Sequence, residues 1–248
     1  MVKKKKEEKK MKKNRKLSID QIFWYFLIFS VLGLVIETLY CYFTMGIWES
    51  RKGFIWGPFC PVYGVGATIL MMVLSQVKGG NIKIFLYGGL LGDIAEYLMS
   101  YVLEAFYGIR FWEYSYTSFN LNGRICVIYT VFWGILSLIL MKIVKPWIDA
   151  QISKIPQKIN TVLVISISCF LIIDFFATIW AVTSFEERIY CQYYGIEKTS
   201  QTRIQEIKYQ LEERLFPNEK MVKTFPNLRF IDEKGTEYYI KDILNKKD

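Results

Sequence analysis

The chain has 248 residues, a net charge of +9 and no histidine. Hydrophobic side chains make up 52% of it although 32 basic and 23 acidic residues are present, so the charge must be concentrated between long apolar runs. The missing histidine excludes Ser-His-Asp and Cys-His nucleophile arrangements, H-E-x-x-H zinc sites and imidazole proton relays. The composition therefore favours a membrane protein over a histidine-dependent enzyme.

Five apolar runs are each near the ~20 residues that one helical crossing of a bilayer needs. They are residues 21–45, 58–77, 84–106, 125–144 and 160–183. We therefore predict an all-α, polytopic membrane protein with about five spans. It would have a basic cytoplasmic segment (1–18), a transmembrane helical domain (19–185) and a soluble or interfacial tail (186–248). Pro58 and Pro61 open the second run, so a re-entrant entry remains an alternative there.

The basic residues predict the orientation, because Lys and Arg near helix ends stay cytoplasmic. Residues 1–16 hold ten of them, the 77–83 connection two and the 142–158 connection four. The opposite loops hold only four. The N-terminus is thus predicted in the cytoplasm and the tail on the outer side of the membrane. The N-terminal lysines suit an orientation signal that also attracts anionic lipid, and nucleic-acid binding is not expected because no aromatic residue interleaves with them.

Carboxylates interrupt three of the apolar runs. A charged side chain near the bilayer centre is unfavourable by about 2.5 to 3.5 kcal/mol, so such groups should face protein or water. At 100° per residue, Asp93, Glu96 and Glu104 share one side of their helix. The first run carries a similar stripe of polar residues along one side, and the fifth run carries a shorter one. These stripes consist of Ser30, Gly33, Glu37, Tyr40 and Thr44, and of Asp174 and Thr178.

We predict that the polar stripes meet around a pocket open toward the outside, with loop arginines at its mouth. Its substrate-binding or ion-binding candidates are Glu37, Asp93, Glu96, Glu104, Asp174, Arg51, Arg124 and Asn122. Its lining candidates are Tyr63, Tyr97, Ser100, Trp112 and Tyr114. The alternative is a structural ion-pair network of Glu37, Glu96 and Arg124, or a protonated Asp93. No cofactor is predicted; carboxylates suit a hard divalent cation, but no compact ligand spacing identifies one.

Two connections on the predicted outer side combine fixed backbone angles with interfacial aromatics. In ESRKGFIWGPFCPVYGVGA (49–67), prolines restrict the backbone and glycines permit close helix approach. In GIRFWEYSYTSFNLNGRIC (108–126), aromatic residues precede Asn120, Asn122, Gly123 and Arg124, which suit a turn or a ligand contact.

Three blocks, RKGFIWGPFCPVYG, EYLMSYVLE and FWEYSYTSFNLNGRIC, resemble the family catalogued as putative ABC-transporter type IV. Its members are CmpB-like putative ABC transporter permeases of Gram-positive bacteria. The resemblance covers about residues 20–185 and implies an integral plasma-membrane protein with a transport role. The chain has no G-x-x-x-x-G-K-[ST] loop, so any ATPase would be a separate subunit. The matching positions are Arg51, Gly53, Gly57, Pro58, Pro61, Tyr63, Gly64, Glu96, Tyr97, Ser100, Glu104, Trp112, Tyr114, Asn120, Asn122, Gly123 and Arg124.

The five cysteines form no C-x-x-C motif and are odd in number. Small apolar packing is their expected role, with a Cys60–Cys126 disulfide as the alternative. In the tail, Ile204, Ile207, Leu211 and Leu215 mark one face of a helix that Pro217 ends, and residues 228–242 suit a hairpin around Lys234-Gly235. We expect a soluble cap or an interfacial helix there, with partner docking as the alternative.

A permease-like transport protein is the leading hypothesis. Five spans are few for a transporter acting alone, so a homo-oligomer or a second membrane subunit is implied. The pocket carboxylates would couple a cation or proton, and the arginines would hold an anionic group. The alternatives are an intramembrane enzyme acting on a lipid or lipid-linked phosphate, and a signalling or assembly subunit.

Overall fold

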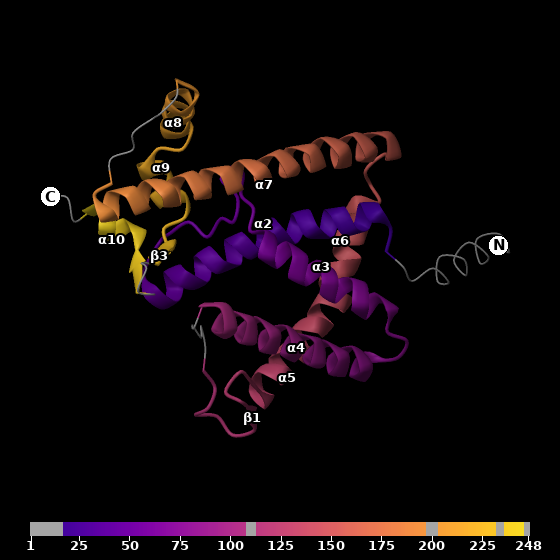
Figure 1. The fold of residues 1–248 in the computed structure, drawn as a ribbon. Helices are drawn as coiled ribbons and strands as arrows, with labels where there is room; N and C mark the ends of the chain where they lie inside the picture. The colour runs from indigo at the N-terminus through magenta and orange to yellow at the C-terminus, as the bar shows by residue number, and fades with distance from the viewer. Residues whose placement is uncertain (1–16, 108–112, 197–202, 232–235, 246–248) are drawn as a thin grey trace. The chain divides into compact units, whose positions relative to one another are not determined.

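The computed structural model describes residues 17–107, 113–196, 203–231 and 236–245. Figure 1 shows a chain built almost wholly of helices, as predicted. The helices before the tail are α2 (Ile19–Met45), α3 (Pro61–Gln76), α4 (Asn81–Tyr107), α5 (Val127–Ile139), the π-helical η1 (Leu140–Val144), α6 (Lys145–Ile152) and α7 (Gln157–Tyr194). The tail adds α8 (Arg203–Leu215), α9 (Asn218–Thr224) and α10 (Ile240–Asn245). Two antiparallel pairs join β1 (Asn120–Leu121) to β2 (Ile125–Cys126), and β3 (Arg229–Ile231) to β4 (Glu237–Tyr239).

Three stretches of the described chain are long and apolar enough to cross a membrane: Ile19–Met45, Val127–Ile152 and Gln157–Tyr194. The helix α3 is apolar but has only 16 residues. The helix α4 has 27 residues, among them Asp93, Glu96 and Glu104. The structure therefore confirms a helical protein with membrane-compatible spans, while the count of five stays a prediction.

The fourth apolar helix continues past residue 144, where the hydropathy run ends. The stretch α5–η1–α6 is helical from Val127 to Ile152, so only residues 153–156 connect it to α7. Pro146 explains the π-helical turn before it, because a proline inside a helix removes one hydrogen bond and crowds the carbonyl four residues earlier. A π turn accommodates that defect without breaking the helix.

The chain divides into two compact units. Unit 1 comprises Met1–Phe26 and Val65–Asn160, and unit 2 comprises Leu27–Gly64 and Thr161–Asp248. In unit 1, α4 packs closely on α5 because glycines face the contact. A Cβ on Gly89 would lie 2.9 Å from the Thr130 carbonyl oxygen. A Cβ on Gly88 would lie 2.2 Å from Ser137 Oγ, and one on Gly92 would lie 2.1 Å from the Trp133 ring.

In unit 2, the tail folds onto the C-terminal part of α7 (Figure 1). The core consists of Ile55, Ala181, Phe185, Ile189, Phe216, Met221, Phe230 and Ile240. Arg188 fixes the tail by donating to the Phe216 carbonyl oxygen (2.6 Å) and to Asn218 Oδ1 (2.9 Å). The predicted tail helix and the antiparallel strands are both confirmed. The Lys234-Gly235 turn lies outside the described residues.

Candidate functional site

The 113–126 connection forms a tight hairpin that positions Arg124. Asn122 and Gly123 both have positive φ (55° and 67°), and the Arg124 N–H donates to the Leu121 carbonyl oxygen at 3.0 Å. This is a type I′ turn, which favours Asn-Gly because both central residues must adopt left-handed angles. Asn120 Oδ1 accepts from the Gly123 N–H (3.1 Å), so the predicted turn is present.

The turn directs the Arg124 side chain onto α4, where it is buried. Its guanidinium pairs with Glu104 at 2.5 Å and donates to Ser100 Oγ at 2.9 Å. The rings of Tyr97 and Tyr101 lie 5.6 and 5.7 Å from it, close enough for cation–π attraction. Arg124 is therefore neutralised by Glu104, one of the predicted α4 carboxylates, and this pair fastens the hairpin to α4.

Asp93 and Glu96 lie one turn apart on α4, on the side that faces α5. Asp93 Oδ2 accepts from Thr130 Oγ1 at 2.8 Å. The other oxygen, Oδ1, and the Glu96 Oε2 are buried and have no hydrogen-bond partner among the described residues. Trp133 lies beside Glu96, but its indole N–H likewise lacks a partner with hydrogen-bond geometry in the described chain. Each of these two neighbouring carboxyl groups thus has one buried oxygen that can still accept a hydrogen bond or bind a cation.

Near α4, two further lining candidates have defined surroundings. Asn122 donates to the Tyr97 hydroxyl at 3.0 Å. Tyr114 is 7% exposed and stacks on Tyr129, with 4.6 Å between ring centroids. Tyr114 lies in the connection between α4 and α5. Burial raises the pKa of its hydroxyl above the usual value. Trp112 lies outside the described residues.

In unit 2, part of the polar stripe of α2 packs against the 60–63 segment and part of it is exposed. Tyr63 lies against Gly33, where a Cβ would collide with its ring, and the Tyr63 hydroxyl donates to Glu37. Ser30 is fully buried, and its carbonyl oxygen accepts from the Cys60 N–H at 2.9 Å. Tyr40, by contrast, is 60% exposed. Glu37 is therefore held by the start of α3.

Asp174 is fully buried and anchors the 49–60 segment to α7. Its Oδ1 accepts from the Trp56 N–H at 3.1 Å, and the Ile55 N–H donates to Thr178 Oγ1 at 2.9 Å. The other Asp174 oxygen has no partner among the described residues, and neither does the buried Nε of Arg51. Lys52 supplies positive charge nearby. The site therefore combines one satisfied carboxyl oxygen with one open oxygen.

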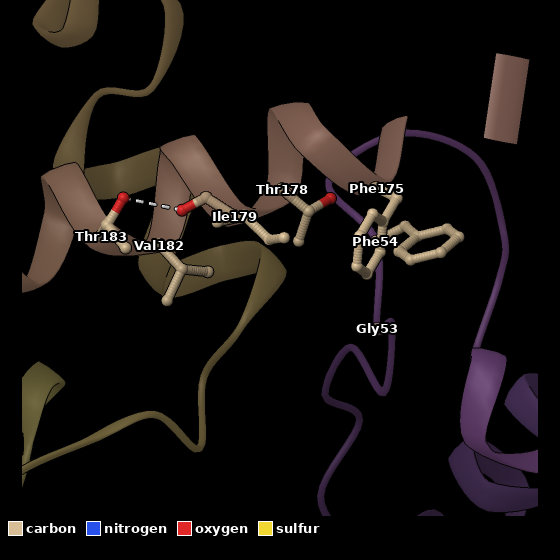
Figure 2. Close-up of a pocket in the computed structure, with 7 residues that line it drawn as sticks. All are labelled: Gly53, Phe54, Phe175, Thr178, Ile179, Val182 and Thr183. Atoms are coloured by element: carbon tan, nitrogen blue, oxygen red, sulfur yellow. Dashed lines mark hydrogen bonds between the residues drawn. The ribbon is translucent and has the colours of Figure 1, made fainter. Parts of the chain in front are cut away.

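An open apolar groove lies beside this anchor. It has a volume of about 280 Å³ and is lined by Gly53, Phe54, Phe175, Thr178, Ile179, Val182 and Thr183. Figure 2 shows Phe54 and Phe175 meeting at one end, while Thr183 Oγ1 is turned back to the Ile179 carbonyl oxygen at 2.8 Å. The Thr183 hydroxyl is thus occupied, and the lining is mostly hydrocarbon.

Sequence reasoning missed a polar cluster at the start of α2. Asp149 of α6 accepts from the Tyr25 hydroxyl (2.5 Å), from Gln21 (3.1 Å) and from Lys145 (2.6 Å). Asn160 at the start of α7 donates to Asp20 at 2.7 Å and accepts from the Trp24 indole at 2.7 Å. These residues fall at the ends of the hydropathy runs, where polar groups are expected, so no single one stood out.

The structure does not bring the candidates into one cluster of metal ligands. No group of three or more Cys, Asp or Glu side chains suited to a metal ion occurs in the part of the chain that the structure describes. The five cysteines are free thiols, and Cys41 and Cys126 are buried, as small apolar packing requires. The Cys60–Cys126 disulfide stays an alternative, because the two residues belong to different units. A pocket lined jointly by all the candidates stays a prediction, because they belong to two units.

Three helical stretches long and apolar enough to cross a membrane, together with close glycine contacts between helices, are typical of helical membrane proteins. A family model described as "Putative ABC-transporter type IV" matches residues 24–179, and the chain belongs to that family. The match covers the predicted helical domain and stops before the tail. No curated protein and no solved structure matches the chain.

Proposed function

We propose that the protein is a permease-like transport protein of the plasma membrane in which Asp93 and Glu96 bind the coupling proton or cation. The observation that carries the proposal is the pair of buried carboxyl oxygens on α4 without partners in the described chain. Intramembrane ionisable groups mark ion and proton pathways more often than they mark structural sites. Membership of a transporter family supports the same role.

The other charged candidates take three different roles under this proposal. Arg124 and Glu104 neutralise each other, so we assign them to holding the hairpin on α4. In unit 2, Arg51 keeps a buried Nε without a partner in the described chain, so it is the better candidate for an anionic group on a substrate. Glu37 accepts from Tyr63, and Asp174 anchors the 49–60 segment through the Trp56 N–H, so we assign both supporting roles although one Asp174 oxygen stays open in the described chain.

The test is ligand-dependent thermal stability of the purified full-length protein in detergent. The ligands are Na⁺, K⁺, Mg²⁺, Ca²⁺ and Mn²⁺, together with a pH series. A ligand that binds only the folded form at about 100 times its Kd stabilises it by about 2.7 kcal/mol. We expect one cation or protonation to raise the Tm of the wild type, and Asp93→Asn and Glu96→Gln to lose that rise.

Two variants serve as controls. Glu104→Gln removes a carboxylate that is already paired with Arg124, and Glu219→Gln removes an exposed one on α9, so both should keep the ligand-induced rise. If Asp93→Asn and Glu96→Gln keep the rise too, or if no cation and no pH change stabilises the wild type, the proposed coupling site is wrong. Flux of the stabilising ion in proteoliposomes then tests transport directly.

The apolar groove beside Asp174 favours a second candidate, an intramembrane enzyme acting on a lipid or lipid-linked phosphate. Its apolar lining suits an acyl chain, and Arg51 and Lys52 directly precede Gly53 at its edge. Incubation of the purified protein with radiolabelled phospholipid separates the two functions. A new lipid product would favour the enzyme, whereas ion flux without lipid turnover would favour transport.

A transport role also implies partners. The chain lacks a phosphate-binding loop, so ATP-driven transport would need a separate ATPase subunit. We also propose a homo-oligomer or a second membrane subunit, because few spans must enclose the pathway. Co-purification from membranes solubilised in a mild detergent, followed by mass measurement of the intact complex, identifies either one.

A further inference from the structure

The helix α8 presents an apolar face that stays partly to largely exposed in the described chain. Ile204, Ile207, Leu211 and Leu215 are 79%, 56%, 43% and 39% exposed. The opposite edge of the same helix is docked, because Glu212 is 2% exposed and accepts from the Trp180 indole at 2.7 Å. The helix is therefore fixed to the rest of unit 2 along one edge and open along another.

Charges on α8 are sorted around this apolar face. At 100° per residue the four apolar side chains span about 80° of the helix circumference. Basic side chains flank them: Lys208, which also pairs with Glu212 at 3.7 Å, lies about 60° from the centre of the face on one side, and Arg214 about 60° on the other. The acidic Glu206 and Glu213 lie about 140° to 160° away, on the far side. This is the pattern of a helix lying in a membrane interface, where basic residues extend to phosphates and acidic residues face water.

The position of α8 along α7 places it at the end of a membrane span. Before Trp180, α7 presents apolar side chains that are largely exposed: Ile172, Ile173 and Phe176 are 56%, 60% and 63% exposed. After Trp180 the tail covers α7, and Ala181, Phe185 and Ile189 are fully buried. The border between lipid-facing and tail-covered helix thus falls at the residue that contacts α8, and tryptophan itself favours the interface.

We propose that α8 is an in-plane interfacial helix whose Ile204–Ile207–Leu211–Leu215 face is buried in the phospholipid headgroup region beside α7. The lipid bilayer is chosen over a protein partner because the flanking bases match lipid phosphates and because α8 is tethered where a span leaves the membrane. The inference is independent of the transport proposal and of the predicted orientation, since both leaflets offer headgroups.

The test compares a fluorophore on two adjacent positions of the full-length protein. Exposed and half-buried native cysteines are first replaced by alanine (Cys60, Cys169 and Cys191). The environment-sensitive dye NBD is then attached to Ile207→Cys or Glu206→Cys, and each protein is reconstituted in vesicles of phosphatidylcholine and phosphatidylglycerol. We expect brominated phospholipid to quench the label at 207 about twofold more than at 206, because an interfacial helix buries its apolar face about 5–10 Å deep. Aqueous iodide should show the reverse preference.

Two results would overturn the proposal. Equal quenching of both labels by iodide would place α8 in water. A label at 207 that neither brominated lipid nor iodide reaches would mean that a protein surface, such as a second copy of the chain, covers the face. Leu211→Cys and Glu213→Cys repeat the comparison further along the same helix, so the test does not depend on one pair of variants folding.

Discussion

At the scale of single residues, the buried Arg124 supports a sharp prediction about stability. Arg124→Ala removes the ion pair with Glu104, the hydrogen bond to Ser100 and two aromatic contacts. Breaking a buried pair leaves the remaining charge unpartnered, at about 3–5 kcal/mol when both groups are buried. The Glu104 side chain is 38% exposed and can be hydrated, so we expect a loss of about 2–3 kcal/mol. Thermal unfolding in detergent measures it.

Glu104→Gln is the matched variant for that prediction. The amide oxygen can still accept from Arg124, and Ser100 and the tyrosines stay in place, so the expected loss is smaller, about 1–2 kcal/mol. A double-mutant cycle between the two changes gives their coupling. Equal losses from both single variants would mean that the Glu104 pair alone holds the hairpin and that the tyrosine contacts contribute nothing.

The sequence predicts this hairpin better than it predicts the partner of Arg124. Asn122-Gly123 indicates the turn because few residue pairs tolerate two positive φ angles. The choice of Glu104 over Glu96 or Glu37 depends on how far along α4 the hairpin folds back, and that distance is set by tertiary packing. Asp149 was missed for a related reason: its donors Gln21 and Tyr25 come from more than a hundred residues away.

At the scale of elements, the contact between α4 and α5 depends on glycine. Gly89→Ala would place a Cβ 2.9 Å from the Thr130 carbonyl oxygen, which is main chain and cannot rotate away. Overpacking of this kind is unfavourable by about 1–3 kcal/mol. We expect a lower thermal midpoint for Gly89→Ala in detergent, together with loss of the Thr130–Asp93 alignment.

Gly66→Ala is the control, because nothing lies within 4 Å of the Cβ it would add. Alanine has the higher helix propensity, so this change should be neutral or stabilising by up to about 1 kcal/mol. If the two substitutions had the same effect, helix propensity rather than close packing would explain the Gly89 result. Glycine spacing in the sequence indicates that helices approach closely, but it does not say which helix is the neighbour.

The hydrophobic pattern of the sequence predicts where a helix lies better than where it ends. The amphipathic pattern correctly located α8, since its apolar residues recur every three to four positions. The helix α7, however, runs 38 residues, about 57 Å at 1.5 Å per residue, beyond an apolar run that ends near 183. Its last turns are stabilised by packing of the tail around Phe185 and Ile189, a tertiary effect that a hydropathy window does not register.

At the scale of the whole molecule, the number of crossings determines on which side the tail lies. The predicted five spans place the C-terminus outside, opposite the lysine-rich N-terminus. Two crossings decide the count. The helix α3 has 16 residues and is about 24 Å long against a hydrocarbon core of about 30 Å, and α4 carries three carboxylates. Each of these crossings changes the side of everything after it.

Fusions of alkaline phosphatase and of green fluorescent protein read these sides separately, because the first is active only outside and the second fluoresces only inside. We expect fluorescence for fusions after Gly80 and Ser153, and phosphatase activity for fusions after Trp48, Tyr107 and the last residue. The basic residues of the 77–83 and 142–158 connections are the physical reason for the cytoplasmic positions. Phosphatase activity after Gly80 would mean that α3 is re-entrant. A fluorescent C-terminal fusion would then follow from four crossings, and the tail with α8 would lie on the inner leaflet within reach of a cytosolic ATPase.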